Sequence, residues 1–245
     1  MKLFPDRSRP LIFAHRGLSS LAPENTFAAF RKARELNVAG IELDVHICAE
    51  NKLIVAHDDT FARTAGDNRA IKNLFLREIR EIDVGAWFDP AFNGEKPPIL
   101  EDVIEEFCPE MYIDIELKTK MVKDDMLPQL VAEKIIAFGD KIMNSISISS
   151  FNPFALVAFK RLCPKIPVAL IWSADKEVPF ILRYGFGRFI VSCDYLKPIY
   201  KQVNKGLFAL KKPIVPWVID DLVLAEKMLG AGCEGIISNK AHIFQ

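Results

Sequence analysis

Short apolar runs rich in β-branched residues recur along the chain, and several of the gaps between them carry a helical pattern. Residues 41–47 show the clearest alternation, with Ile, Leu, Val and Ile at the odd positions and Glu, Asp and His at the even ones. Alternation with a period of two is typical of a strand that has one polar side. Strands are predicted at 11–14, 41–47, 53–56, 111–117, 145–151, 167–172, 189–193, 214–219 and 235–237.

Two of the helical patterns have clear ends. One has its apolar face on Phe27, Phe30, Ala33 and Leu36, and it follows the start signals of the sequence Pro-Glu-Asn-Thr at 23–26. The other runs from about 221 to 229, with Asp220 or Asp221 as its N-cap and Gly230 as its stop. Strands that alternate with helices predict a parallel α/β architecture, which a doubly wound sheet and a closed barrel both satisfy.

Two stretches break the alternation. The connection 48–52 is too short for a helical crossover, so the runs on either side of it form either a hairpin or an irregular connection. Residues 59–98 contain no clear strand and resemble an insertion with one helix near 76–82. No repeat or linker divides the chain, and we expect residues 1–245 to form one domain with this embellished loop.

Composition excludes several classes of protein. Half of the 245 residues are hydrophobic, which excludes a disordered chain, and 32 basic against 32 acidic side chains leave no overall field for nucleic acid. Five cysteines without a C-x-x-C pair indicate reduced, buried thiols in a cytoplasmic protein. The charged, proline-containing N-terminus does not resemble a secretory leader, and no apolar run reaches the ~18 residues of a membrane helix.

Polar residues that can take part in catalysis or metal binding lie on or just after four predicted strands. The first run ends in His15-Arg16, the second carries Glu42 and Asp44, the third ends in His57, and the fourth carries Asp114, Glu116 and Lys118 at alternate positions. Side chains two residues apart on a strand lie on one side, ~6–7 Å apart, so Glu42 and Asp44 can share a cation. Carboxylate ligands without cysteine–histidine spacing indicate a hard cation, Mg²⁺ or Ca²⁺.

These motifs together resemble the glycerophosphodiester phosphodiesterase family. The resemblance is carried by His-Arg-Gly at 15–17, Pro-Glu-Asn-Thr at 23–26, Gly-Ile-Glu-Leu-Asp-Val at 40–45, Val-Ala-His-Asp at 55–58 and Ile-Glu-Leu-Lys at 115–118, and later motifs extend it in the family's order. It implies a (β/α)₈ TIM barrel with a short insertion after the third strand-like segment. It also implies hydrolysis of glycerophosphodiesters, which are small molecules, to glycerol 3-phosphate and an alcohol.

The resemblance also implies roles for individual residues. Glu42, Asp44 and Glu116 match the ligands of one divalent cation, Mg²⁺ or Ca²⁺, and His15 and His57 match the general acid and base. Arg16 and Lys118 would flank the substrate phosphate, while Trp217 would form an apolar wall beside the glycerol or alcohol portion, although a core tryptophan is the other interpretation. Which histidine is the acid, and which alcohol is preferred, stay open at this point.

Two departures from the family pattern and two alternative functions accompany this interpretation. The usual Asp-Gly turn is Glu50-Asn51 here, and the usual Trp-Thr-Val-Asn is Trp-Val-Ile-Asp at 217–220, where Asp220 is interpreted as a helix cap. The first alternative is a lysophospholipase-D-like activity. The 18 phenylalanines could form a lipid-facing mouth for such an activity, but most of them lie in strand or helix patterns and are expected in the core. The second is a non-catalytic barrel that binds phosphodiesters. Such a protein would be expected to have lost at least one of the proposed metal ligands or histidines, and none of them is lost here.

Overall fold

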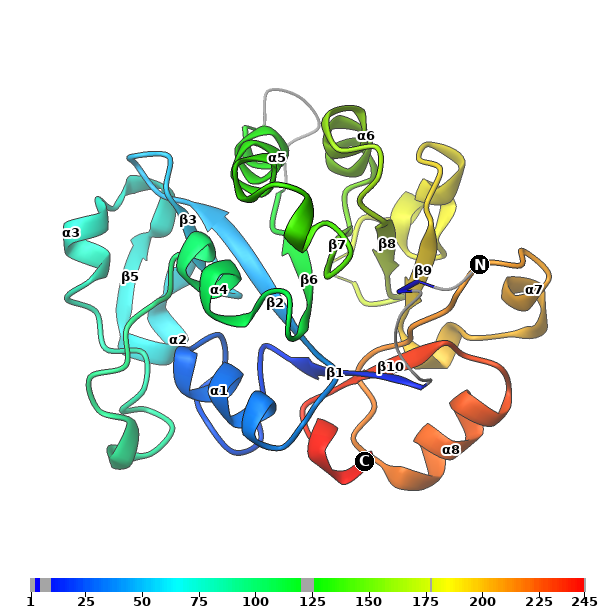
Figure 1. Ribbon diagram of the computed structural model, residues 1–245, viewed down its shortest axis with the longest axis horizontal. Helices are drawn as coiled ribbons and strands as arrows, with labels where there is room; N and C mark the ends of the chain where they lie inside the picture. The colour runs from blue at the N-terminus through cyan, green and yellow to red at the C-terminus, as the bar shows by residue number, and fades with distance from the viewer. Residues whose placement is uncertain (1–2, 5–9, 120–125, 177, 245) are drawn as a thin grey trace.

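Seven parallel strands form one curved sheet in the order β10-β1-β2-β6-β7-β8-β9, as Figure 1 shows. The computed structural model describes residues 3–4, 10–119, 126–176 and 178–244. The strands are β1 Leu11–His15, β2 Gly40–Ile47, β6 Tyr112–Leu117, β7 Ile146–Ser150, β8 Val168–Trp172, β9 Tyr195–Pro198 and β10 Gly235–Ser238.

The segment 214–219 closes this sheet into a barrel. It is joined to β9 by parallel bridges from Leu196 to Ile214 and from Ile199 to Trp217. On its other side, the backbone N–H of Ile219 donates to the carbonyl of Ile237 at 2.9 Å, which ties the segment to β10. The segment therefore takes the eighth position in the barrel wall, where the sequence predicts a strand. The structure has the expected barrel architecture.

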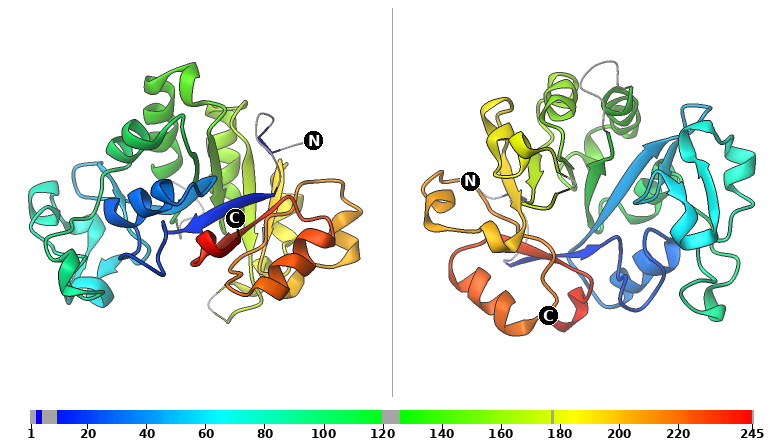
Figure 2. Two further views of the ribbon diagram at one scale, coloured as in Figure 1. Left: turned by 60° about the horizontal axis from the view of Figure 1, so that its bottom comes forward. Right: turned by 180° about the vertical axis from the view of Figure 1, so that it is seen from behind.

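Helices cover the outside of the strands, and Figure 2 shows them from two further directions. The longer ones are α1 Phe27–Glu35, α4 Leu100–Phe107, α5 Leu127–Phe138, α6 Pro153–Leu162 and α8 Leu222–Gly230, and α7 Lys205–Phe208 is a single turn. Helix α1 confirms the predicted start: the Thr26 hydroxyl accepts from the N–H of Ala29, while Phe30 is fully buried and meets Phe107 edge to face.

Strand β3, Leu53–Val55, pairs antiparallel with the end of β2, so the hairpin alternative for residues 41–57 is correct. Its turn contains Asn51 with φ 57°, a left-handed conformation that Asn tolerates better than most residues. The Glu50-Asn51 departure is thus compatible with a tight turn.

The insertion 59–98 has more structure than its sequence predicts. It contains a two-stranded antiparallel sheet of β4 Thr60–Phe61 and β5 Asp67–Ala70, the helical turns α2 Ala62–Ala65 and α3 Leu76–Ile79, and 3₁₀ turns at Ile71–Asn73 and Pro90–Phe92. The expected helix near 76–82 is shorter, and the expectation of no strand is wrong. The two strands are too short and too polar to produce an alternating pattern. Buried side chains including Phe61 and Ile71 give this part its own small core.

The strand predicted at 189–193 is wrong. That stretch follows a 3₁₀ turn, Phe186–Phe189, and its large side chains Phe189 and Ile190 are 75% and 46% exposed. The strand is β9, immediately downstream, which contains a lysine and a proline and is nevertheless buried throughout. Because the charged Lys197 interrupts its apolar run, the hydrophobic pattern did not predict this strand.

The five cysteines are free, and all except the partly buried Cys108 are buried, as expected for small core residues. Within the described part of the chain, no helix combines the length and the apolar character needed to cross a bilayer.

Candidate active site

The strand register brings the predicted site residues together at the carboxyl end of the barrel. His15 of β1 lies opposite Glu42 of β2, and Asp44 of β2 lies opposite Glu116 of β6. All three strands are parallel, so their carboxyl ends meet at one rim. His57 reaches the same rim because the β2–β3 hairpin turns the chain back beside Asp44, whose backbone carbonyl accepts from the N–H of Ala56.

Glu42, Asp44 and Glu116 form a buried carboxylate triad. One oxygen of each lies within 4.8 Å of one oxygen of the others, and the residues are 2%, 1% and 8% exposed. Burial, followed by the charge of Asp44, raises the pKa of Glu42 well above its usual value. The convergence of three buried carboxylates fits a divalent cation, which would offset their repulsion and which prefers oxygen ligands. The triad could therefore bind a metal ion.

Two cationic side chains flank the triad. The Nε of Arg16 lies 3.5 Å from Asp44, and the Nζ of Lys118 lies 3.1 Å from Glu116 and 3.4 Å from Asp44. Burial alone would raise the pKa of Asp44, but the charges of Lys118 and Arg16 outweigh it and hold that pKa well below its usual value. Both predicted phosphate ligands are thus next to the triad, each at a different oxygen of Asp44.

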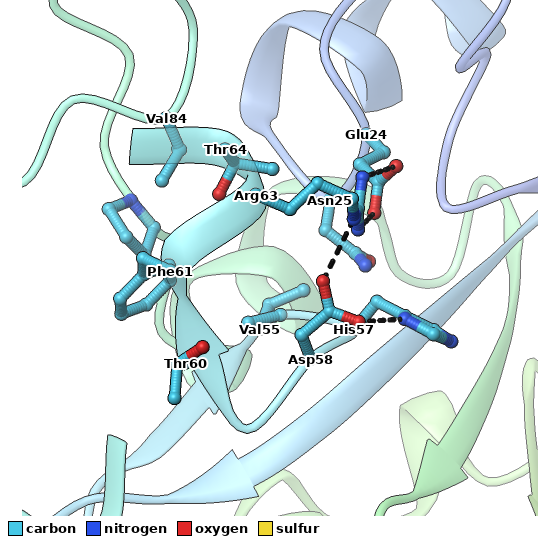
Figure 3. Close-up of a pocket in the computed structure, with 12 residues that line it drawn as sticks. Glu24, Asn25, Val55, His57, Asp58, Thr60, Phe61, Arg63, Thr64 and Val84 are labelled. Carbon is cyan, nitrogen blue, oxygen red and sulfur yellow. Dashed lines mark hydrogen bonds and ion pairs between the residues drawn. The ribbon is translucent and has the colours of Figure 1, made fainter. Parts of the chain in front are cut away.

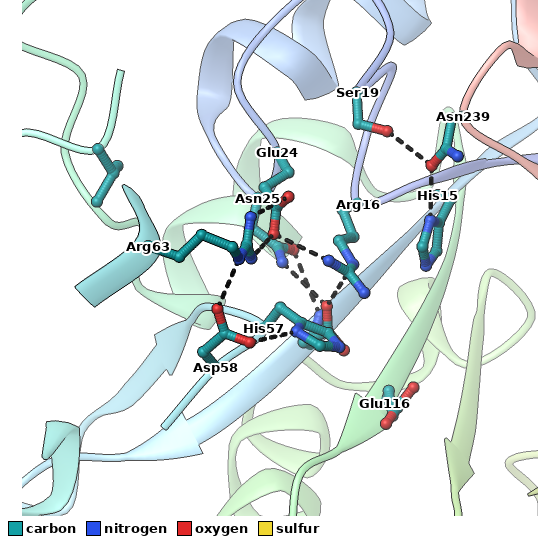
Figure 4. A network of polar contacts seen from close by, with 12 residues as sticks. His15, Arg16, Ser19, Glu24, Asn25, His57, Asp58, Arg63, Glu116 and Asn239 are labelled. Atoms are coloured by element: carbon teal, nitrogen blue, oxygen red, sulfur yellow. Dashed lines mark hydrogen bonds and ion pairs between the residues drawn. The ribbon is translucent and has the colours of Figure 1, made fainter. Parts of the chain in front are cut away.

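His15 is oriented by Asn239, as Figure 4 shows, and Asn239 is in turn held by Asp220. Its Nδ1 lies 2.7 Å from the Oδ1 of Asn239, and the amide Nδ2 of Asn239 donates to Asp220 at 2.7 Å. Because that amide nitrogen is engaged, Nδ1 of His15 is the donor, and its Nε2 points toward Glu42 at 3.9 Å. Burial, followed by the charge of Arg16, lowers the pKa of His15 to about 4. The imidazole is therefore neutral near pH 7.

His57 is held by a second chain of contacts, visible in Figures 3 and 4. Its Nδ1 lies 2.7 Å from the carboxylate of Asp58, which also accepts from the Nε of Arg63 at 2.9 Å. Arg63 makes a two-point contact with Glu24 at 2.6 and 2.9 Å, and Glu24 accepts from Arg16 at 3.0 Å. A residue of the insertion, Arg63 on α2, thus connects His57 to Arg16 through Asp58 and Glu24.

Trp217 lies half-buried on the segment 214–219, which closes the barrel. Its indole N–H donates to the carbonyl of Lys197 at 2.9 Å, and its ring meets Phe151 edge to face with centroids 5.8 Å apart. Both neighbours fix the ring at the barrel end without burying it fully. This position is compatible with the wall predicted from the sequence.

A buried polar cluster beneath the triad was not predicted. The Nζ of Lys197 donates to Asp114 at 2.6 Å and to Ser149 at 2.9 Å, and the hydroxyl of Tyr195 donates to Asp114 at 2.8 Å. Lys197 is 1% exposed, and its charge acts to lower the pKa of Glu42. Alternation had placed Asp114 on the side of Glu116. Asp114 accepts from Ser147 of β7 and from Tyr195 and Lys197 of β9, and the sequence signal on β9 is a lysine within an apolar run.

Asn239, Asp58, Glu24 and Arg63 were also absent from the predicted site. Asp220 was interpreted as a helix cap, but Asp221 caps α8 through the N–H of Leu224, and Asp220 instead holds Asn239. The replacement of the family's usual Asn by Asp220 therefore affects the orientation of His15, through Asn239, more than it affects the start of α8.

Comparisons with known proteins agree with this geometry. A model of the glycerophosphoryl diester phosphodiesterase family matches residues 15–242. A glycerophosphodiester phosphodiesterase of Caldanaerobacter subterraneus is 31% identical over 94% of each chain, and one of Bacillus subtilis is 27% identical over 99% of this chain and 87% of its own.

Solved structures support the same fold. A phosphodiesterase of Oleispira antarctica, in complex with the product sn-glycerol-3-phosphate, superposes with a TM-score of 0.81 at 24% identity, covering 96% of this chain and 95% of its own. A glycerophosphodiester phosphodiesterase of Agrobacterium tumefaciens gives 0.79 at 24% identity, covering 96% and 99%. The expected barrel class is confirmed.

Proposed function

Because this chain belongs to the glycerophosphoryl diester phosphodiesterase family, we propose that it hydrolyses glycerophosphodiesters to glycerol 3-phosphate and an alcohol through His15 and His57. The chain is a phosphoric diester hydrolase of this family. The observation that carries the proposed mechanism is the meeting of two histidines and three buried carboxylates at one barrel rim.

Glu42, Asp44 and Glu116 would hold one Mg²⁺ or Ca²⁺ ion. The oxygen donors and their burial support this assignment. When bound, the cation supplies charge stabilisation to a phosphate oxygen. Of the chain's own groups, Lys118 and Arg16 hold the pKa of Asp44 well below its usual value, and the buried Lys197 offsets part of the burial that raises the pKa of Glu42.

The two histidines would move the protons of the reaction. Phosphodiester hydrolysis needs one proton taken from the attacking oxygen and one given to the departing alkoxide. The Nδ1 atoms of both rings are engaged, by Asn239 and by Asp58, so each ring presents its Nε2 for proton transfer. The neutral state of His15 favours it as the group that accepts a proton.

Arg16 and Lys118 would bind the phosphate, the guanidinium through paired hydrogen bonds and the ammonium as a point charge. Each already contacts a carboxylate, which fixes its position before substrate arrives. Trp217, partly buried against Phe151, would form the apolar wall beside the glycerol or alcohol portion. We also propose that residues 1–245 are one barrel domain with the insertion at 59–98, and that the free cysteines reflect a cytoplasmic location.

The test is the release of glycerol 3-phosphate from the purified protein. Substrates are glycerophosphocholine, glycerophosphoethanolamine and glycerophosphoglycerol, each with Mg²⁺, with Ca²⁺ and after chelation. We expect release from at least one diester, dependent on the added cation. A parallel assay with lysophosphatidylcholine measures choline release, which would favour the lysophospholipase-D-like alternative if it exceeded turnover of every water-soluble diester. Full turnover after exhaustive chelation would disprove the cation assignment.

A further inference from the structure

Aromatic side chains are exposed on the connection between β8 and β9, where 3₁₀ turns at Phe180–Leu182 and Phe186–Phe189 take the place of a helix. Phe180 and Phe189 are 72% and 75% exposed, and Tyr184 and Phe186 are 51% and 46% exposed. Leaving one such side chain in water rather than burying it costs roughly 1.5–3 kcal/mol. Four of them within one short connection are more than the scattered apolar positions of an ordinary surface.

These side chains form one continuous surface with two arginines. The ring centroids of Phe180 and Tyr184 are 6.4 Å apart, as are those of Tyr184 and Phe186. The guanidinium of Arg183 lies 5.9 Å from the Phe180 ring, and that of Arg188 lies 4.5 Å from the Phe189 ring. We refer to Phe180, Arg183, Tyr184, Phe186, Arg188 and Phe189 as the aromatic patch.

The backbone fixes this exposure. Gly185, with φ 72°, lies so close to Trp172 that an added Cβ would come within 2.9 Å of the indole ring. Gly187 is equally close to Leu170, at 3.0 Å from an added Cβ. Because the glycines face the barrel, the aromatic residues on either side of them face outward. The connection also leaves the carboxyl end of β8, the end at which the carboxylate triad lies.

The charge of the patch is positive. Arg183 donates to the backbone carbonyls of Val178 and Lys176 at 2.7 and 2.8 Å, and Arg188 donates to the carbonyl of Gly185 at 2.8 Å. Among the residues that the structure describes, neither guanidinium forms an ion pair with a carboxylate. Asp194, at the end of the connection, is engaged by Lys160 at 2.6 Å.

We propose that the aromatic patch binds the surface of a membrane that contains anionic phospholipids. Aromatic rings partition to the headgroup level of a bilayer, and arginines beside them are attracted to anionic lipids by about 1 kcal/mol each. A second copy of the chain fits the patch less well, because a two-fold interface centred on it would bring two positively charged patches together. The inference does not depend on the proposed reaction.

The test is co-sedimentation of the full chain with vesicles of phosphatidylcholine, with and without about 30% phosphatidylglycerol. We expect binding to the anionic vesicles that weakens at roughly 0.5 M NaCl. The double variant Phe180→Ser/Phe189→Ser should lose at least about tenfold in partitioning. Arg188→Gln should reduce the preference for anionic over neutral vesicles. Hydrolysis by the double variant of a water-soluble diester that the wild type turns over should equal that of the wild type.

Phe75→Ser is the matched control. Phe75 is 45% exposed on the insertion, and the guanidinium of Arg77 lies 5.5 Å from its ring, so this variant removes a similar group from another surface. Thermal melting of each variant establishes that it is folded. Equal sedimentation of the wild type and the folded double variant would overturn the proposal. So would a dimer seen by analytical ultracentrifugation that the double variant abolishes while vesicle binding is absent.

Discussion

His15 and His57 are each oriented through Nδ1, but by different groups. The partner of His15 is a neutral amide, Asn239, and the partner of His57 is a carboxylate, Asp58. Neither partner touches the triad directly. The histidine rings themselves face the triad: Nε2 of His15 lies 3.9 Å from Glu42, and the charge of His57 acts to lower the pKa of Asp44.

His57→Ala should remove most turnover while cation binding stays measurable. General acid or base assistance is typically worth ~10²–10⁴ in rate, which exceeds the effect of a mild packing defect. The measurement is kcat at saturating cation and substrate, with cation binding followed by calorimetry. His15→Ala should behave in the same way. If His57→Ala kept about a third of wild-type turnover, the two-histidine mechanism would be wrong.

Glu116→Gln should show the opposite pattern. It removes one oxygen charge from the triad, so cation affinity should fall while part of the activity returns at high cation concentration. The cation concentration for half-maximal activity is the measurement. An unchanged value would argue that Glu116 is not a ligand.

Asn239→Ala should lower kcat by roughly 10²-fold with a small change in KM, because a catalytic ring that loses its orientation reacts slowly. The variant removes the acceptor that holds Nδ1 of His15. Ser19→Ala is the control, since the Ser19 hydroxyl donates to the same oxygen at 3.0 Å without touching His15. Equal kcat values for the two variants would remove Asn239 from the mechanism.

The low pKa of His15 also affects stability. An unfolded His15 titrates near its ordinary value of 6.5, whereas the folded one titrates at about 4, so the unfolded state binds more protons between these values. The free energy of unfolding should therefore rise as pH rises from 4 to 6.5, by up to roughly 3 kcal/mol from this group. Urea unfolding with chelator present, for wild type and His15→Gln, tests this. A His15→Gln curve parallel to that of the wild type would contradict it.

At the scale of elements, a buried ion pair joins β6 to β9 across the barrel interior. Asp114 and Lys197 are 2% and 1% exposed, and hydroxyls of β7 and β9 complete their hydrogen bonds. Because both charges are far from water, each depends on the other.

Lys197→Met should destabilise the fold by about 3–5 kcal/mol, because Asp114 is left as a buried, unpaired charge. The double variant Lys197→Met/Asp114→Asn should recover part of that loss. Chemical denaturation measures both. A single variant as stable as the wild type would mean that the pair is not essential to the joint between β6 and β9.

At the scale of the whole molecule, the triad connects β2 with β6, so a cation bound there would bind only the folded chain. Removing it should lower the melting temperature, since about 100 times Kd of free cation stabilises by about 2.7 kcal/mol. Melting with and without chelator is the measurement, and Glu116→Gln is the control whose shift should be smaller. A shift of equal size in both proteins would place the cation elsewhere.

The sequence by itself determined the elements that have strong local patterns. It also determined which polar side chains of those elements share one side of a strand. The alternation at 41–47 sets Glu42 and Asp44 on one side of β2, because side chains on a strand repeat every two residues. The start signals before α1 and a cap at Asp220 or Asp221 before α8 were similarly readable, since a cap acts within its own turn. The arrangement of parallel strands then placed His15 and Glu116 beside them.

Only the tertiary structure decided which distant groups meet. Lys197 and Asp114 are 83 residues apart, and His15 and Asn239 are 224 residues apart. A lysine reads as exposed until its buried partner is known, which is why β9 was missed and 189–193 was predicted in its place. Periodicity likewise could not tell the exposed Phe180 and Phe189 from core residues, because local pattern records hydrophobicity but not whether another segment covers it.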